Sequence, residues 1–301
     1  MSIILALIGY GFQAVDSILN KFILEKTTVK PTLFLFYSTI TALPVFLLLP
    51  FGTERLIGVM DYSVALCSGL MFAAALAAMY TAIQESEISH IGPLLGAVIP
   101  FFVLILSYFF LGEVIVTQVL VGIGILILGS LIIAFEKSRL HQGFHRGVMW
   151  GVLAGFFFAV SHVTAKYTYD VHGFLTGFVY TRGFSGLVGI VLLALPSIRR
   201  ALFTAKQKTA PTKSLGQTSI VVIEKVVGFF GVVLLQYATA IGSVTIVNAL
   251  AGAQFALLIG LVALLSKIRP AVFKEEYQGR EIVQEIIGVI VIALGLILII
   301  R

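Results

Sequence analysis

Charged residues are scarce in this chain. Only 11% of its 301 residues are Asp, Glu, Lys or Arg, whereas 59% are hydrophobic, and the mean hydropathy is +1.08. A water-soluble domain carries roughly twice that charged fraction, about 25%. The composition therefore excludes a soluble enzyme or a soluble binding domain. It predicts a polytopic α-helical membrane protein whose first partner is the lipid bilayer.

Cysteine and metal-binding patterns are also nearly absent. Cys67 is the only cysteine and lies in an apolar run, which excludes disulfides and thiolate metal sites within the chain. His141 and His145 stand four residues apart in a polar loop with no third ligand nearby, so we expect no metal site there. The sequence also lacks a phosphate-cradling loop, a GxSxG elbow and an HExxH helix. From these absences we expect that the protein is neither an enzyme nor an ATP-driven pump, and that it binds no cofactor.

Ten apolar segments follow one another along the chain. Each approaches the roughly 20 residues that an α-helix needs to cross a bilayer. The polar stretch Glu136–Gly147 divides them into two groups of five, which predicts two five-helix units, residues 1–136 and 147–301. The segments are Ile3–Leu24, Thr32–Pro50, Ser63–Ile83, Ile91–Phe110, Val114–Phe135, Gly147–Tyr167, Phe174–Leu195, Ser219–Ala240, Val244–Leu265 and Ile282–Ile300.

The two units resemble each other at three places in the same order. Phe12–Phe22 aligns with Phe157–Tyr167, Pro100–Leu106 with Gln254–Gly260, and Gln118–Gly129 with Gln284–Gly295. Because each unit has an odd number of segments, the second unit must enter the membrane in the opposite sense. This predicts inverted repeats, a plan that recurs in secondary transporters and places the substrate site at the repeat interface.

Basic residues concentrate in the loops after the first, fifth, seventh and ninth segments. The net charge of +6 therefore predicts orientation in a membrane better than it predicts a nucleic-acid partner. By the positive-inside rule the basic loops are cytoplasmic and both termini lie outside a plasma or inner membrane. The residues are Lys26, Lys30, Lys137, Arg139, Arg146, Arg199, Arg200, Lys206, Lys208, Lys213, Lys267, Arg269, Lys274 and Arg280.

The fourth segment contains two prolines, Pro93 and Pro100. Proline deletes a backbone hydrogen bond and bends a helix, and in lipid the freed carbonyl needs a partner in protein or water. We therefore predict a bend at Pro100 that faces a cavity. In the ninth segment Gln254 replaces this proline, which predicts a straighter helix.

These features resemble the drug/metabolite transporter superfamily, specifically its ten-helix EamA-type members. Pro100, Glu113 and the helix with Gly122 and Gly129 resemble the end of an EamA repeat, and Arg182 resembles an arginine often found in the second helix of a repeat. The resemblance implies export of amino acids, other metabolites or drugs, while relatives move sugar phosphates or nucleotide sugars. Members often have cytoplasmic termini, contrary to the charge count.

The first segment carries a polar stripe of Gln13, Asp16, Ser17 and Asn20, spaced so that all four share one helix face. A charge in the centre of a membrane helix costs about 2.5–3.5 kcal/mol on insertion scales, so it is retained for a function or a partner. One interpretation is a cavity wall in which Asp16 contacts a substrate amine or a proton. The alternative is a hydrogen-bonded packing stripe.

The second unit carries further polar residues within its apolar segments. His162 is a candidate proton relay or a packed histidine. Arg182 cannot readily discharge, so it either pairs with Glu224 or binds a substrate carboxylate or phosphate. Asn248 and Gln254 are candidate hydrogen-bonding residues of a cavity, or packing residues.

The leading hypothesis is a secondary transporter, an exporter of small metabolites such as amino acids, that works by alternating access and is coupled to protons. Its midplane cavity would be lined by segments one, four, six, seven and nine. Alternatives are an organophosphate or nucleotide-sugar exchanger, and a non-transporting scaffold or lipid-binding protein. The protein would be a monomer or a homodimer. The predicted substrate-binding residues are Gln13, Asp16, Asn20, His162, Arg182, Glu224, Asn248 and Gln254.

Overall fold

The structure is a computed structural model. It describes residues 1–24, 31–51, 56, 58–85, 88–134, 146–196, 198–200, 215–268 and 279–300. Every regular element in this part of the chain is a helix, as the apolar composition predicts. The elements are α1 (Ser2–Leu24), α2 (Pro31–Ile40), the 3-10 helix η1 (Leu43–Leu48), α3 (Val59–Glu85), α4 (Ile88–Leu111), α5 (Thr117–Ala134), α6 (Arg146–Leu192), α8 (Leu215–Ile241), α9 (Val244–Ala249), α10 (Ala251–Ile268) and α11 (Gly279–Ile300).

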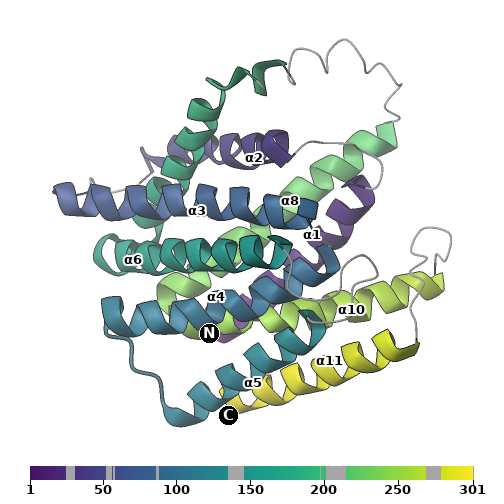
Figure 1. Ribbon diagram of the computed structural model, residues 1–301. Helices are drawn as coiled ribbons and strands as arrows, with labels where there is room; N and C mark the ends of the chain where they lie inside the picture. Colours follow the sequence, from purple (N-terminus) through teal and green to yellow (C-terminus); the bar gives the residue numbers. More distant parts are fainter. Residues whose placement is uncertain are drawn as a thin grey trace.

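Seven spans in the described residues are long and apolar enough to cross a membrane, and two shorter apolar stretches, Leu35–Leu48 and Val226–Ile241, accompany them. Backbone groups in hydrocarbon have no water to bond, so helices, which satisfy them internally, are the stable form of such segments. Figure 1 shows most of these helices lying side by side in roughly one direction. The chain is therefore a multi-pass membrane protein.

The longest helix, α6, is two helical arms joined by a turn at Gly173. Its 47 residues would extend for about 70 Å if straight, more than twice the hydrocarbon core. Gly173 has φ 76° and ψ 166°, a conformation that glycine adopts without steric cost, and the ribbon changes direction sharply there (Figure 1). The two segments predicted at Gly147–Tyr167 and Phe174–Leu195 correspond to these arms.

Two of the predicted segments are divided in the structure. The segment Thr32–Pro50 is split between α2 and η1. The segment Val244–Leu265 is interrupted at Leu250, where the backbone N–H of Ala253 bonds the carbonyl of Leu250 at 2.9 Å, a three-residue spacing in place of the α-helical four. The prediction of a straighter ninth helix is therefore wrong, because the helix changes its hydrogen-bond pattern there without any proline.

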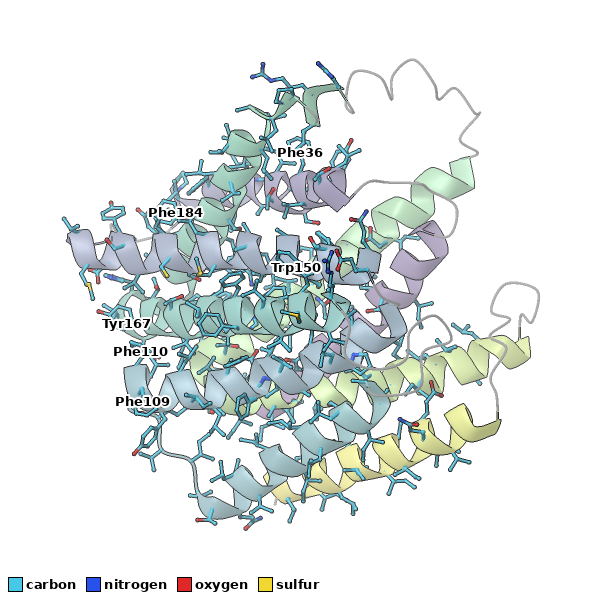
Figure 2. All side chains as sticks on the ribbon, in the orientation of Figure 1. Phe36, Phe109, Phe110, Trp150, Tyr167 and Phe184 are labelled. Carbon is cyan, nitrogen blue, oxygen red and sulfur yellow. The ribbon has the colours of Figure 1, made fainter. Side chains whose placement is uncertain are left out.

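The helix with the two prolines runs on without interruption. Both Pro93 and Pro100 lie inside α4, which is helical from Ile88 to Leu111. The bend predicted at these prolines remains a prediction. Beyond the helix, Gly112 has φ 65° and turns the chain toward α5. Phe109 and Phe110, each 74% exposed, project from this end of the molecule (Figure 2), as aromatic residues do at a membrane interface.

Helices α5 and α11 lie side by side (Figure 1) and pack through glycines. A Cβ added to Gly122 would lie 3.0 Å from the carbonyl oxygen of Gly295, and one added to Gly288 would lie 3.2 Å from that of Gly129. The glycines noted in the sequence therefore let the two backbones approach each other closely, as small residues do between membrane helices.

Glutamine side chains join the same two helices at both ends of the contact. The amide of Gln118 donates to the carbonyl of Leu298 at 3.1 Å, and the amide of Gln284 donates to the carbonyl of Ile132 at 2.6 Å. Gln118 aligns with Gln284, and by the same shift along the chain Ile132 aligns with Leu298. Each bond is thus the counterpart of the other, which is the pattern of a contact between two equivalent surfaces.

The other close pairs join α3 to α6, α1 to α8, and α4 to both α5 and α6. The last residues of α1 and α10 and the first residues of α8 and α11 lie at the same side of the molecule, on the right in Figure 1. These helix ends flank three of the four predicted basic loops. Most residues of those loops lie outside the described residues, as do His141 and His145.

We predict that Gly122→Ala and Gly129→Ala each lower the free energy of unfolding by about 1–3 kcal/mol, because the added methyl group overpacks the α5–α11 contact. The Cβ would lie 2.8 Å from Ile299 in the first variant and 2.7 Å from Ile292 in the second. Thermal unfolding of the purified protein in detergent measures the effect.

The matched control is Gly124→Ala, in the same helix, where an added Cβ meets no atom within 4 Å. This variant is expected to be neutral, or to gain up to about 1 kcal/mol from helix propensity. Equal melting temperatures for all three variants would contradict the prediction.

Candidate functional site

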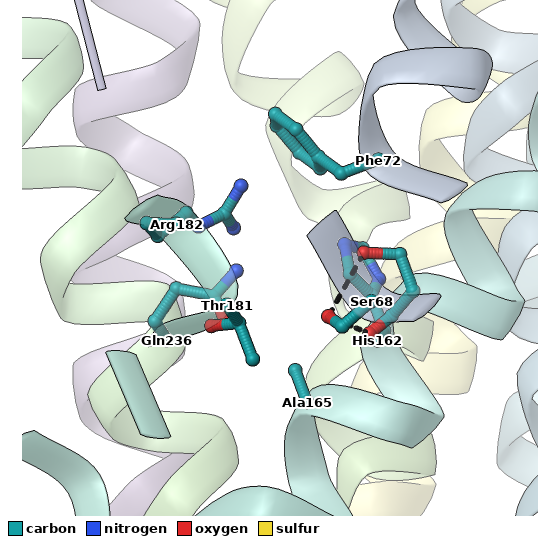
Figure 3. Close-up of a pocket in the computed structure, with 8 residues that line it drawn as sticks. Ser68, Phe72, His162, Ala165, Thr181, Arg182 and Gln236 are labelled. Carbon is teal, nitrogen blue, oxygen red and sulfur yellow. Dashed lines mark hydrogen bonds between the residues drawn. The ribbon is translucent and has the colours of Figure 1, made fainter. Parts of the chain in front are cut away.

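A small polar pocket lies between α3, both arms of α6, and α8 (Figure 3). The guanidinium of Arg182 and the amide of Gln236 lie on one side of the gap, and Ser68 and His162 lie on the other. Of these elements, α3 belongs to the first predicted unit, and the two arms of α6 and the helix α8 belong to the second. Its lining residues are Ser68, Phe72, Ser161, His162, Ala165, Thr181, Arg182 and Gln236.

Close packing of α3 against both arms of α6 holds the two sides of the pocket in position. Gly69 of α3 faces the second arm of α6 so tightly that an added Cβ would lie 2.6 Å from the backbone nitrogen of Ser185. The neighbouring Ser68 donates to the carbonyl of Ser161 at 2.9 Å and lies 3.4 Å from its hydroxyl. This contact fixes α3 against the first arm of α6, so α3 sits between the two arms.

Arg182 stacks on an aromatic ring. Its guanidinium carbon lies 4.1 Å from the centroid of Phe72, a cation–π contact that is stronger where water is excluded. Phe72 in turn packs edge-on against Phe158 at 5.6 Å. The guanidinium therefore has one face covered by Phe72 and its edge available to the pocket.

Of the two alternatives that the sequence left for Arg182, the ion pair with Glu224 is not formed: no salt bridge joins the two side chains in the described part of the chain. Arg182 instead stacks on Phe72 of α3.

His162 is held by Asn248. Its Nδ1 lies 2.6 Å from Oδ1 of Asn248, whose amide nitrogen donates to the carbonyl of Val244 at 2.8 Å. Since the amide nitrogen is engaged by Val244, the carbonyl oxygen faces the ring, and Nδ1 must carry the hydrogen. The polar atom of the ring that remains for the pocket is Nε2.

Gln236 is oriented in the same way. The hydroxyl of Tyr169 donates to Oε1 of Gln236 at 2.8 Å, and both side chains are buried. With its oxygen accepting this bond, the amide nitrogen of Gln236 is the group that it offers to the pocket. Neither Tyr169 nor Gln236 was among the predicted site residues.

The predicted stripe on α1 faces α8 and α10 instead of the pocket. The amide of Gln13 lies 3.5 Å from the carbonyl of Gly228, and the amide of Gln254 donates to the hydroxyl of Ser17 at 3.4 Å. The carboxylate of Asp16 also lies against α8: a Cβ added to Gly228 would be 2.7 Å from its Oδ1. These contacts join the two units.

A second polar cluster lies on the Tyr80 side of α3. The hydroxyls of Tyr80 and Ser38 are 2.9 Å apart, and the carboxylates of Asp16 and Glu224 both act electrostatically on Tyr80. Glu224 is buried. The side chain of the predicted residue Asn20 lies outside the described residues. Two of the predicted residues, His162 and Arg182, therefore line the pocket, and Asn248 supports it from behind.

The helices around the pocket differ from the predicted set. Of segments one, four, six, seven and nine, only six and seven, the arms of α6, line it; α3 and α8 complete it. Sequence reasoning missed α3 because Ser68, Phe72 and Tyr80 are isolated among apolar residues and include no charge. Their spacing at four and eight residues, which gives one helix face, was the available signal. Within the described residues no group of three metal-ligating side chains is found.

Comparison with known proteins supports the resemblance seen in the sequence. Residues 1–135 match the model of the EamA-like transporter family, which confirms the similarity to the drug/metabolite transporter superfamily. No curated protein matches the chain. A solved structure titled "Crystal structure of protein" is similar over 99% of this chain and 94% of its own, with a TM-score of 0.67 and 14% identity. At that identity the likeness shows the fold alone. The family match indicates a membrane transporter of small molecules.

We predict that His162→Phe and Asn248→Leu each destabilise the protein by about 1–3 kcal/mol, because each leaves one buried polar partner unsatisfied. The double variant is expected to cost less than the sum of the two, with a coupling of about 0.5–3 kcal/mol. Thermal unfolding in detergent measures all three variants.

The control is a double-mutant cycle of Asn248→Leu with Gln284→Leu, because Gln284 bonds a different pair of helices. The changes in the free energy of unfolding of these two variants should add within about 0.5 kcal/mol. Additivity in the His162–Asn248 cycle as well would show that the 2.6 Å contact does not stabilise the pocket wall.

Proposed function

We propose that the chain is a secondary transporter that exports small metabolites, such as amino acids or related compounds, by alternating access between two inverted five-helix units. The pocket at the contact between the units carries this proposal. Its walls come from α3 of the first unit and from α6 and α8 of the second, so a movement of one unit against the other would open or close it.

The α5–α11 contact supports the inverted repeat. Its two glutamine–carbonyl bonds correspond to each other under the same shift that aligns the repeats. Equivalent helices that meet in this reciprocal way are related by an approximate two-fold axis. Since the glycine contacts pair the start of one helix with the end of the other, the helices are antiparallel, and such an axis lies in the membrane plane. With α6 counted as two spans and the two shorter apolar stretches included, the described residues contain ten apolar stretches, a number that supports the proposed ten spans.

Within this proposal Arg182 contacts an anionic group of the substrate, and Asp16 carries the coupled proton or contacts a substrate amine. Arg182 has its edge toward the pocket. Asp16 lies where α1 meets α8, a contact between the units that alternating access would change. A carboxylate at such a contact can take up a proton when the contact opens, as carboxylates do in proton-coupled transporters.

An organophosphate or nucleotide-sugar exchanger is the second candidate within transport. A phosphate dianion calls for several cations, and Arg182 is the single cationic side chain among the residues that line the pocket. A non-transporting scaffold or lipid-binding protein would have no use for a pocket with one cation, one oriented amide and one oriented imidazole. The pocket therefore favours transport of a small compound that carries one anionic group.

We predict that Asp16→Asn lowers proton-driven transport of a small-metabolite mixture in proteoliposomes about tenfold or more, and removes its dependence on pH. A tenfold loss corresponds to about 1.4 kcal/mol. Asp170→Asn is the control, because this exposed carboxylate pairs with Lys166 at 2.7 Å on the surface of α6. Unchanged rate and pH dependence in Asp16→Asn would remove Asp16 from the mechanism.

The orientation given by the basic loops predicts which helix ends face outward. Val59, at the start of α3, is 85% exposed and would lie outside, whereas Glu85, at its other end, would lie in the cytoplasm. In a Cys67→Ala background, Val59→Cys should react with a membrane-impermeant maleimide on intact cells and Glu85→Cys only after lysis. The reverse pattern would place the termini in the cytoplasm.

A further inference from the structure

The polar groups of the pocket divide into donors and one acceptor. The guanidinium of Arg182 donates and carries a positive charge, and the amide nitrogen of Gln236 donates because its oxygen is occupied by Tyr169. Nε2 of His162 accepts in the neutral ring, because Nδ1 holds the hydrogen that bonds Asn248. The hydroxyls of Ser68 and Thr181 donate to the backbone carbonyls of Ser161 and Gly177. The charged and amide groups of the pocket are thus donors, and they lie beside the acceptor of His162.

The charge of the pocket is positive. None of the eight residues that line it carries a carboxylate, and each of them lies in the part of the chain that the structure describes. The predicted acid Asp16 faces α8 at Gly228, and α1 contributes no residue to the pocket. An ammonium group bound here would stand beside Arg182 without a counter-charge, which is costly in surroundings of low dielectric constant.

Size restricts the ligand further. The pocket lies between Ala165 at its base and the Phe72 ring at the opposite end (Figure 3), and in this conformation its walls leave no room for a water molecule. A ligand therefore enters only when the walls move apart, and a compound of three or four carbons requires less movement than an aromatic or nucleotide ligand. A carboxylate is planar and accepts two hydrogen bonds from a guanidinium edge, which gives Arg182 a matching partner.

We infer that the pocket selects small organic monoanions that carry a neutral hydrogen-bond donor next to the carboxylate, such as 2-hydroxy acids, over zwitterionic amino acids of the same size. The carboxylate binds Arg182 and the amide nitrogen of Gln236, and the neighbouring hydroxyl donates to Nε2 of His162. Asn248 is a positioning residue that keeps the ring in the tautomer that accepts. This inference rests on the proposed function, of which it names the substrate class.

The test uses four probes of equal size: lactate, propionate, alanine and lactamide. Binding to the purified protein is measured by calorimetry at pH 8, where an imidazole is neutral. Lactate is expected to bind about 3–10-fold more tightly than propionate, the effect of one hydrogen bond. Lactate should also bind at least about tenfold more tightly than alanine, which adds a positively charged ammonium group. The same margin is expected over lactamide, which lacks the negative charge of the carboxylate.

Variants assign the contacts. Arg182→Gln should lower lactate affinity about tenfold or more and remove the difference between lactate and lactamide. His162→Phe should remove the preference for lactate over propionate, so that the ratio of the two affinities falls to about one. His162→Gln, which can place an amide oxygen near the position of Nε2, should restore part of that preference. A general packing defect would weaken both ligands alike.

Counterflow of the same probes in proteoliposomes separates this inference from the proposed function. Binding in the expected order without any counterflow would leave the site assignment standing and overturn transport. Counterflow with alanine preferred, alanine binding as tightly as lactate, or no binding of either carboxylate at millimolar concentration would overturn the inference. If counterflow occurred with alanine preferred, the proposed transport function would stand.

Discussion

Water is absent from the hydrocarbon core, so each polar group in this fold must find its partner inside the protein. Many hydroxyls bond the backbone of their own helix: Thr164, Thr168 and Thr181 each donate to the carbonyl four residues earlier. The glutamines of α5 and α11 bond carbonyls across the helix pair. A polar residue in a span is therefore usually structural, and the functional candidates are those whose local bonds leave a donor or acceptor directed elsewhere.

This criterion explains how far the sequence could lead. Apolar runs reveal membrane helices because their length and composition are determined by the bilayer. The predicted repeat rests on Gln118, Gly122 and Gly129, whose counterparts in the second half are Gln284, Gly288 and Gly295. The pocket was only partly predictable. Charge drew attention to His162 and Arg182, whereas Ser68 and Gln236 have the same composition as residues that merely pack. Only the three-dimensional contacts show that the oxygen of Gln236 is engaged by Tyr169 and that its amide nitrogen remains.

The partner of a charge within a span was the other property that the sequence did not reveal. Arg182 and Glu224 both stand in apolar segments, and the simplest way to balance two such charges is to pair them. No salt bridge joins them in the described part of the chain, and Arg182 stacks on Phe72 of α3 instead. A sequence shows that a span contains a charge, but only the three-dimensional contacts show which side chain lies against it.

The two predicted units have equivalent contacts at α5 and α11 and different contacts at their first helices. At α5 and α11 the contacts are reciprocal, residue by residue. At the first helix of each unit they are not: Asp16 faces Gly228 of α8, whereas its aligned counterpart Ser161 bonds Ser68 of α3. In a transporter that works by alternating access, equivalent packing surfaces favour exchange between an inward-open and an outward-open conformation of equal energy. A substrate without two-fold symmetry places no such requirement on the polar groups. Under the proposed function, the polar groups of the pocket are thus free to differ between the units.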